Sequence, residues 1–129
     1  MIVLDASAMV ELLRPTRIAD EVMGAVTGQR LHAPHLLDVE VLQVFRRFRR
    51  RGELSPEDVE AAAERLADFP MRRHAHVALL PRVLELSHNA TAYDAVYLAL
   101  AEALGATLLT CDSKLAAVPQ CQADVLVVG

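Results

Sequence analysis

The sequence of 129 residues fits one folded domain and carries a net charge of −4. Hydrophobic residues make up 53% of it, which excludes an intrinsically disordered chain, and the low aromatic content of 4% leaves few platforms for stacking bases. The negative charge disfavours a protein that only coats RNA or DNA. It does not disfavour a nuclease, because bound cations neutralise the carboxylates of such a site. We expect a single domain over residues 1–129.

Short apolar runs alternate with helical periodicity along the chain. In chain order, the expected elements are a strand over residues 2–4, helices over 7–13 and 16–26, a strand over 31–33, helices over 36–51 and 56–69, a strand over 73–77, helices over 81–88 and 92–104, and strands over 107–110 and 125–128. Because strands and helices alternate, the pattern favours a three-layer α/β fold with a parallel sheet.

Three of the expected helices carry clear signals. Residues 36–51 are amphipathic, and Gly52 is placed to end that helix. Its core-facing stripe is expected to consist of Leu37, Val41, Val44 and Phe48. Ser55–Asp58 is a capping-box pattern, and Thr91–Asp94 is a second one. The helix that follows Thr91 is apolar nearly all round, which predicts that it is buried.

Four carboxylates stand at positions where surface charges are unusual. Asp5 ends the first strand and Asp112 follows the strand over 107–110, at the sheet edge where α/β proteins bind ligands. Asp94 lies in the first turn of the buried helix, and Glu40 lies at the margin of an apolar stripe. Each also has an ordinary structural interpretation: a helix cap for Asp5 and Asp112, a capping-box acid for Asp94, and a solvated charge for Glu40.

Together, these acids predict a metal site. Four converging carboxylates could not all stay ionised without cations beside them. Ligands that are all oxygen suit Mg²⁺ or Mn²⁺ rather than zinc. One or two such ions activate water and stabilise the leaving oxygen in phosphodiester hydrolysis. We therefore expect metal-dependent hydrolysis of a phosphodiester at these four residues.

Four segments of the chain resemble PIN-domain proteins of the VapC toxin type. They are M-I-V-L-D-A-S-A at the start, a Glu in the third helical block, T-A-Y-D-A-V-Y-L-A-L-A from Thr91, and L-L-T-C-D-S-K-L from Leu108. The resemblance covers nearly the whole chain, and the segment from Thr91 is its most specific part. It implies an α/β/α fold with a five-stranded parallel sheet of order 3-2-1-4-5, in which Asp5 and Asp112 meet at the ends of neighbouring strands.

The resemblance also implies an activity and roles for individual residues. The acidic quartet that binds Mg²⁺ or Mn²⁺ is matched by Asp5, Glu40, Asp94 and Asp112. Thr110 matches the hydroxyl residue of a T-x-D motif, and Ser7 matches the small polar residue after the first Asp. The implied activity is that of an endoribonuclease toxin of a type II toxin–antitoxin pair, which inhibits translation by cutting structured RNA such as tRNA or rRNA. The implied partners are a VapB-type antitoxin and a second copy in a homodimer.

A basic run ends the amphipathic helix. Arg47 and Arg51 lie seven and eleven residues after Glu40 and share its side of the helix, so RNA phosphates beside the metal site are candidate partners. The alternative is a solvated face, which is the interpretation we favour for Arg46, Arg49 and Arg50.

Two other pairs of residues carry weaker signals. His74 and His76 could share a strand face, but two histidines are too few for a metal-site motif, and an ordinary strand is favoured. Tyr93 and Tyr97 flank Asp94 and are expected to be core or dimer residues rather than platforms for bases.

Three other function classes share part of this pattern. A receiver-like signalling domain has the same length and alternation, but it needs an acidic pair after the first strand, and Asp5 has no acidic neighbour. A haloacid-dehalogenase-type phosphatase begins with D-x-D, whereas Asp5 is followed by Ala6 and Ser7. A PIN-like domain that only binds protein partners is the third alternative, and the four acids argue against it.

The composition also bears on the compartment. The start of the chain lacks the basic region of a signal peptide, and no apolar run is long enough to span a bilayer. Cys111 and Cys121 form neither a disulfide framework nor a zinc motif. A cytoplasmic protein is expected.

Overall fold

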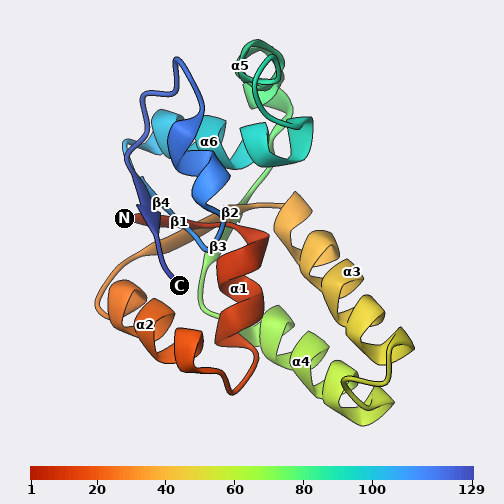
Figure 1. The fold of residues 1–129 in the computed structure, drawn as a ribbon. Helices are drawn as coiled ribbons and strands as arrows, with labels where there is room; N and C mark the ends of the chain where they lie inside the picture. Colours follow the sequence, from red (N-terminus) through yellow and green to blue (C-terminus); the bar gives the residue numbers. More distant parts are fainter.

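The computed structural model describes residues 1–129 and contains one parallel sheet of five strands in the order β3-β2-β1-β4-β5. The strands are β1 (Ile2–Leu4), β2 (Leu31–Pro34), β3 (Arg72–His74), β4 (Thr107–Thr110) and β5 (Val125–Val127). This order confirms the predicted topology. The first and fourth strands are neighbours, so the segments that follow β1 and β4 leave the sheet side by side (Figure 1).

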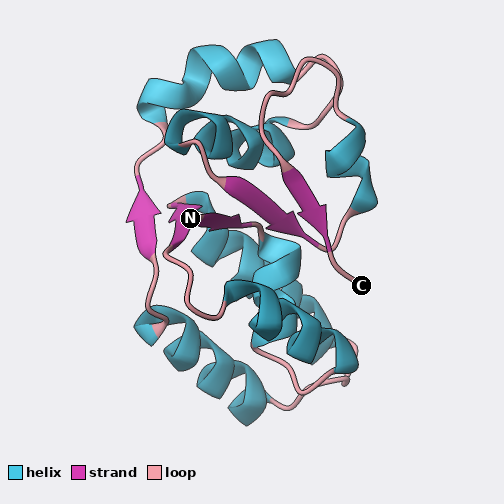
Figure 2. Cartoon of the chain, turned by 90° about the vertical axis from the view of Figure 1, so that its left-hand side faces the viewer, coloured by secondary structure: helices cyan, strands magenta, loops and turns pink.

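Helices cover both faces of this sheet, as expected for a three-layer fold. They are α1 (Ala6–Leu12), α2 (Arg17–Val26), α3 (Leu36–Arg50), α4 (Pro56–Asp68), α5 (Leu80–Leu86) and α6 (Ala92–Leu104), with two short 3₁₀ helices, η1 (Val77–Leu79) and η2 (Ser113–Ala117). Figure 2 shows α5 and α6 on one side of the strands and α1 to α4 on the other. None of these helices has the length and apolar character needed to cross a membrane.

The core is built around β1, β4 and α6. The side chains of Val3, Leu4, Leu108 and Leu109 are fully buried, as in strands that are covered on both faces. Every residue from Ala95 to Ala101 is buried as well, which confirms the expectation for the apolar helix. The helix ends where Gly105 adopts a left-handed conformation, φ 61°, that disfavours side chains with a Cβ.

The predicted stripe of α3 is partly wrong. Leu37 and Val41 are buried as expected, but the third fully buried position is Phe45, and Val44 and Phe48 are only half-buried. The buried residues follow one another at intervals of four, which places them on one line along the helix. Phe48 instead packs edge-on against Phe45 at a centroid distance of 5.9 Å.

The third strand is shorter than predicted. It was expected over residues 73–77, but β3 ends at His74, because its only partner, β2, ends at Pro34, the register partner of His74. The chain then turns into η1. His74 and His76 do not share a strand face, because the strand ends at His74, and His74 Nε2 lies 2.9 Å from Nδ1 of His32 in the neighbouring strand.

Candidate active site

Asp5 is held on both carboxylate oxygens. Its Oδ1 accepts hydrogen bonds from the Ala8 N–H at 3.0 Å and from the Ser7 hydroxyl at 2.7 Å, and its Oδ2 accepts one from the Thr110 hydroxyl at 2.5 Å. The predicted helix cap is therefore confirmed, but the Ala8 N–H is only one of the three groups that donate hydrogen bonds to the Asp5 carboxylate. Burial raises the pKa of Asp5 above its ordinary value, and the hydrogen bonds from Thr110, Ala8 and Ser7 oppose this rise.

The two hydroxyl groups that hold Asp5 are themselves oriented by the backbone after β4. The Cys111 N–H donates to Ser7 Oγ at 2.9 Å, and the Asp112 N–H donates to Thr110 Oγ1 at 2.9 Å. Each hydroxyl thus accepts a hydrogen bond from one backbone amide and donates one to a carboxylate oxygen of Asp5. Thr110 reaches Asp5 because β1 and β4 are adjacent, and both motif residues, Ser7 and Thr110, contact the Asp5 carboxylate.

Asp94 enters the site from the first turn of α6. The Thr91 hydroxyl caps the helix by accepting from the Asp94 N–H at 3.1 Å. The predicted capping box is incomplete, however, because only Ser55 and Asp58 form the reciprocal pair in this chain. Burial raises the pKa of Asp94, Thr91 opposes the rise, and the charge of Asp112 raises the pKa further. Asp94 therefore lies within the electrostatic influence of both the helix start and a second acid.

Glu40 approaches from α3 and is held by a residue whose contact was not predicted. The buried Tyr97, one turn after Asp94 on α6, donates its hydroxyl to Glu40 Oε1 at 2.6 Å. Burial raises the pKa of Glu40; the bond from Tyr97 lowers it, and the charges of Asp94 and Asp5 raise it. Tyr97 is the core residue that was expected. Its contact could have been anticipated only in general terms, because the hydroxyl of a buried tyrosine needs a hydrogen-bond partner.

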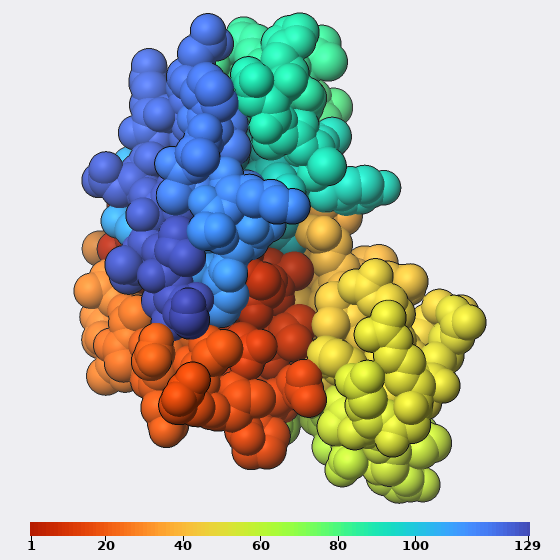
Figure 3. All heavy atoms as spheres, in the orientation of Figure 1, coloured from red at the N-terminus to blue at the C-terminus, as the bar shows by residue number.

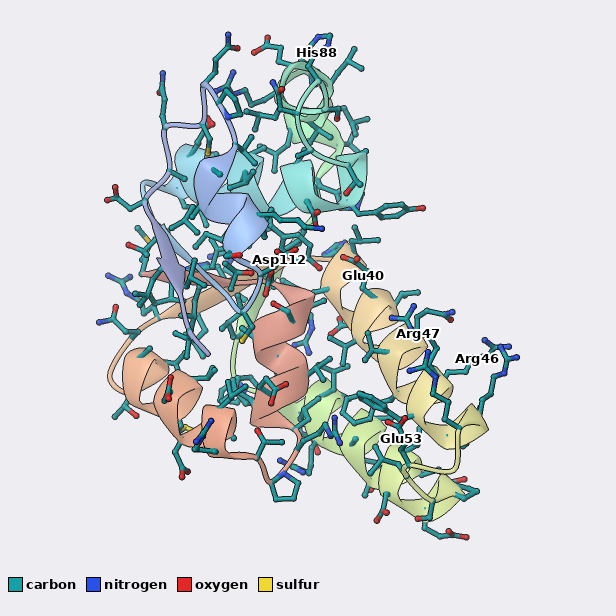
Figure 4. All side chains as sticks on the ribbon, viewed as in Figure 1. Glu40, Arg46, Arg47, Glu53, His88 and Asp112 are labelled. Carbon is teal, nitrogen blue, oxygen red and sulfur yellow. The ribbon has the colours of Figure 1, made fainter.

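Asp94 links the four acids electrostatically. Its charge raises the pKa of both Asp5 and Glu40, and Asp112 raises that of Asp94. Figure 4 shows Glu40 and Asp112 near the point where α1, α3 and α6 meet, with His88 far away at the end of α5. Asp112 also caps η2 by accepting from the Lys114 N–H at 3.0 Å.

A divalent cation needs several ligand atoms close around one point. No three carboxylate, imidazole or thiol side chains come together closely enough to surround one ion in this structure. The chemistry of the group nevertheless fits a hard cation. Its donors are oxygens only, and burial together with mutual repulsion raises the pKa of three of the acids, a strain that a cation would relieve.

Comparison with known proteins identifies the family. The PIN domain family model matches residues 2–120. Ribonuclease VapC9 of Mycobacterium tuberculosis is 38% identical over 128 residues, which cover 99% of this chain and 98% of that protein. The chain is a PIN-domain protein of the VapC family. Ribonuclease VapC1 of the same organism is 39% identical over 131 residues, covering 98% of this chain and 96% of the relative.

Solved structures confirm the PIN fold of this VapC-family chain. The toxin VapC20 of Mycobacterium tuberculosis, described as cleaving the sarcin–ricin loop, superposes with a TM-score of 0.70 at 16% identity, covering 92% of this chain and 95% of that one. VapBC2 of Rickettsia felis, solved with a DNA fragment from its promoter, gives a TM-score of 0.72 at 11% identity with complete coverage of both chains (100%). At such identities the likeness concerns the fold.

A groove of about 370 Å³ runs along α3 and opens on Glu40. We call it the α3 groove; it is lined by Ala6, Leu36, Val39, Glu40, Gln43, Val44, Arg47 and Tyr93. Figure 3 shows the surface indented between the start of α6 and α3. Of the two arginines predicted to lie near the metal site, only Arg47 lines this groove.

The second arginine, Arg51, belongs to a separate hollow of about 230 Å³ that is lined only by Arg47, Arg50 and Arg51. We call this the arginine hollow. Its members lie three and four residues apart, so they share one face of the end of α3. Arg50, for which a solvated face was expected together with Arg46 and Arg49, is exposed and shares this hollow with Arg47 and Arg51. None of the three arginines takes part in an ion pair, because those of the structure involve Arg73 and Arg82.

Proposed function

We propose that this protein is a metal-dependent endoribonuclease that acts as the toxin of a type II toxin–antitoxin pair, cutting structured RNA such as tRNA or rRNA and thereby inhibiting translation. The observation that supports the proposal most directly is the electrostatic coupling of four acids from separate elements, in which Asp94 is linked by charge to the other three. The names of the VapC relatives, ribonucleases of 38% and 39% identity, agree with it.

In this proposal the four acids hold Mg²⁺ or Mn²⁺. Asp5, Asp94 and Asp112 are ligands, and Glu40 is either a ligand or the holder of a bound water. When bound, the cation lowers the pKa of a water molecule and stabilises charge on the scissile phosphate. The part played by Ser7 and Thr110 is to keep Asp5 in one orientation through their hydrogen bonds to its two oxygens.

RNA is proposed to lie along α3. At 1.5 Å per residue, Arg47 and Arg51 stand about 10 Å and 16 Å from Glu40 along the helix axis. The α3 groove connects Glu40 with Arg47, and the arginine hollow continues from Arg47 to Arg51. Because these side chains are exposed and have no acidic partner, they are available to bind phosphates and offset the repulsion between RNA and the acids.

The proposed partner is a VapB-type antitoxin. Related folds include a toxin–antitoxin complex from Klebsiella pneumoniae with a TM-score of 0.73 at 16% identity. The α3 groove combines apolar walls with the carboxylate of Glu40, which suits a peptide that carries an arginine among apolar residues. The groove takes its lining from α3, from Ala6 of α1 and from Tyr93 of α6, and none from α2. Antitoxin added to the toxin should stop RNA cutting.

A second copy is the other proposed partner. The exposed apolar side chains of Val77, Leu80 and Leu84 lie on η1 and α5. Burial of such side chains between two copies would remove apolar surface from water. Light scattering of the purified toxin should then give the mass of a dimer.

The deciding experiment measures cleavage of a structured RNA by purified protein. Mn²⁺ or Mg²⁺ should support cutting, EDTA should stop it, and sequencing of RNA ends after brief induction in cells should reveal the target. Cutting that persists in EDTA would contradict the metal-dependent mechanism. Failure of the protein both to cut RNA and to bind Mn²⁺ in calorimetry would instead favour a domain that only binds proteins.

A further inference from the structure

One hydrogen bond joins the two helices that carry acids into the site. Tyr97 is 2% exposed and donates its hydroxyl to Glu40 Oε1 at 2.6 Å. Tyr97 is on α6 and Glu40 is on α3, on opposite sides of the sheet (Figure 2). It is the only side-chain hydrogen bond between these two helices, and Tyr97 has no other hydrogen-bond partner.

This bond gives the two carboxylate oxygens of Glu40 different surroundings. Oε1 is taken by the phenol, whereas Oε2 accepts no hydrogen bond from the protein. Asp5 differs, because both of its oxygens accept hydrogen bonds from the protein. Glu40 therefore has one free oxygen, and a buried, rigid aromatic ring determines its orientation.

The bond also couples Glu40 to Asp94. Asp94 and Tyr97 are three residues apart on α6, so they lie on one face of that helix. Any movement of α3 relative to α6 would stretch the bond to Glu40 while leaving Asp94 in place. The bond thus links the position of the carboxylate on α3 to that of the carboxylate on α6.

We propose that Tyr97 is a positioning residue that holds Glu40 so that Oε2 alone is presented to a divalent cation or to a water molecule bound to it. This inference rests on the proposed function, since it assigns Tyr97 a role toward the metal of that site. Hydrogen bonds that orient metal-binding carboxylates contribute to metal affinity, and their removal weakens binding or activity by about 10- to 100-fold.

The first test is Tyr97→Phe, which removes one oxygen atom and keeps the shape of the core. Calorimetric titration of the metal-free protein with Mn²⁺ should show affinity weakened by about 10-fold or more. The half-maximal Mn²⁺ concentration for RNA cleavage should rise to match. Ser87→Ala is the control, because it removes one hydroxyl that donates to the Val83 carbonyl at the end of α5, outside the α3 groove; its Mn²⁺ affinity should equal that of the wild type.

The second test asks whether Tyr97 acts through Glu40. In a Glu40→Ala background the phenol has no carboxylate to orient, so Tyr97→Phe should change Mn²⁺ affinity by less than about twofold. Equal losses of affinity in both backgrounds would overturn the proposal. Val22→Ala is the control for a general loss of stability, because Val22 is fully buried on α2. Its Mn²⁺ affinity should be unchanged.

The outcomes separate this proposal from the proposed function. If the wild type cuts RNA with Mn²⁺ and Tyr97→Phe has the same Mn²⁺ affinity, only the role of Tyr97 is overturned. If Tyr97→Phe lowers the melting temperature without weakening Mn²⁺ binding, the bond is structural and the proposal is wrong. If the wild type itself binds no Mn²⁺, the proposed function and the role of Tyr97 both fall.

Discussion

The strand side and the helix side of the site hold their acids by different means. On the strand side, Asp5 follows β1 and accepts three hydrogen bonds, two of them from hydroxyl groups that are fixed by backbone amides after β4. On the helix side, Glu40 accepts one hydrogen bond, from Tyr97. The strand side is thus built into the sheet, whereas the helix side depends on how α3 and α6 pack.

The two sides differ in how firmly hydrogen bonds hold their acids, but both bury acids that are costly to ionise. Burial raises the pKa of Asp5, Glu40 and Asp94 alike, so both sides carry acids that are unfavourable to ionise in the folded protein. Only on the strand side do several hydrogen-bond donors offset the cost of ionising the buried acid. We infer that loss of an acid has the same consequence for catalysis on either side but opposite consequences for stability.

The largest expected effect comes from removing an acid on each side. Asp94→Asn and Asp5→Ala should both reduce RNA cleavage by roughly 1,000-fold or more, because a bound cation contributes several kcal/mol to transition-state stabilisation. Their stabilities should differ. Asp94→Asn relieves repulsion and should unfold no more easily than the wild type, whereas Asp5→Ala leaves donors unpaired and should lose about 1–3 kcal/mol.

Initial cleavage rates and urea unfolding of the metal-free proteins measure this contrast. Full activity of Asp94→Asn would show that the site is assigned wrongly. Equal destabilisation of the two variants would show instead that the strand side and helix side do not differ as described.

A smaller effect is expected from the arginines on the helix side. Arg47→Ala combined with Arg51→Ala should weaken RNA binding uniformly across sequences, by about 10-fold, as expected for one to two lost phosphate contacts. The slope of log affinity against log salt should flatten by about 1 per arginine, and the cleavage position should not move. Because Arg50 shares the arginine hollow, adding Arg50→Ala should extend the loss.

Filter binding at several salt concentrations tests the arginines, with Arg46→Ala combined with Arg49→Ala as the matched control of equal charge. Neither control residue lines the α3 groove or the arginine hollow. A control pair that weakens binding more than the test pair would mean that RNA follows another face of α3.

The smallest effect concerns the pH dependence of metal-free stability. The pKa values of Asp5, Glu40 and Asp94 are raised in the folded state, from ordinary values of 3.8 for Asp and 4.5 for Glu. Above these ordinary values, and up to the raised ones, the folded state binds more protons than the unfolded state. The free energy of unfolding contributed by these acids therefore falls as pH rises through that window.

Comparison of the wild type with Asp94→Asn isolates this contribution, because both proteins share all the other titrating groups, including His32 and His74. The wild type should lose more stability than the variant between about pH 4 and neutral pH, as judged by urea unfolding without metal. Mn²⁺ at neutral pH should restore the wild type and have little effect on the variant. A wild type that gains stability relative to the variant across this window would contradict the raised pKa values.

Much of the site could be predicted from the sequence because its signals are local. The ends of β1 and β4 follow from short apolar runs that stop at polar residues, and neighbouring parallel strands bring Asp5, Ser7 and Thr110 together. The capping pattern at Thr91 placed Asp94 in the first turn of α6, although the reciprocal bond of a capping box did not form. The resemblance to VapC proteins supplied the strand order, which periodicity alone does not determine.

The chain by itself thus determined the fold class and the helical phase of Glu40, and it singled out the four acids, whose role as metal ligands stays a prediction. Only the tertiary structure decided that Tyr97 reaches Glu40, that Arg50 rather than Arg46 joins the arginine hollow, and that residues 75–77 leave the sheet. The physical reason is the same in each case. Helical periodicity places a residue on one face of a helix, but it does not give the distance to a side chain 57 positions away. A strand continues only as far as its neighbour offers backbone partners.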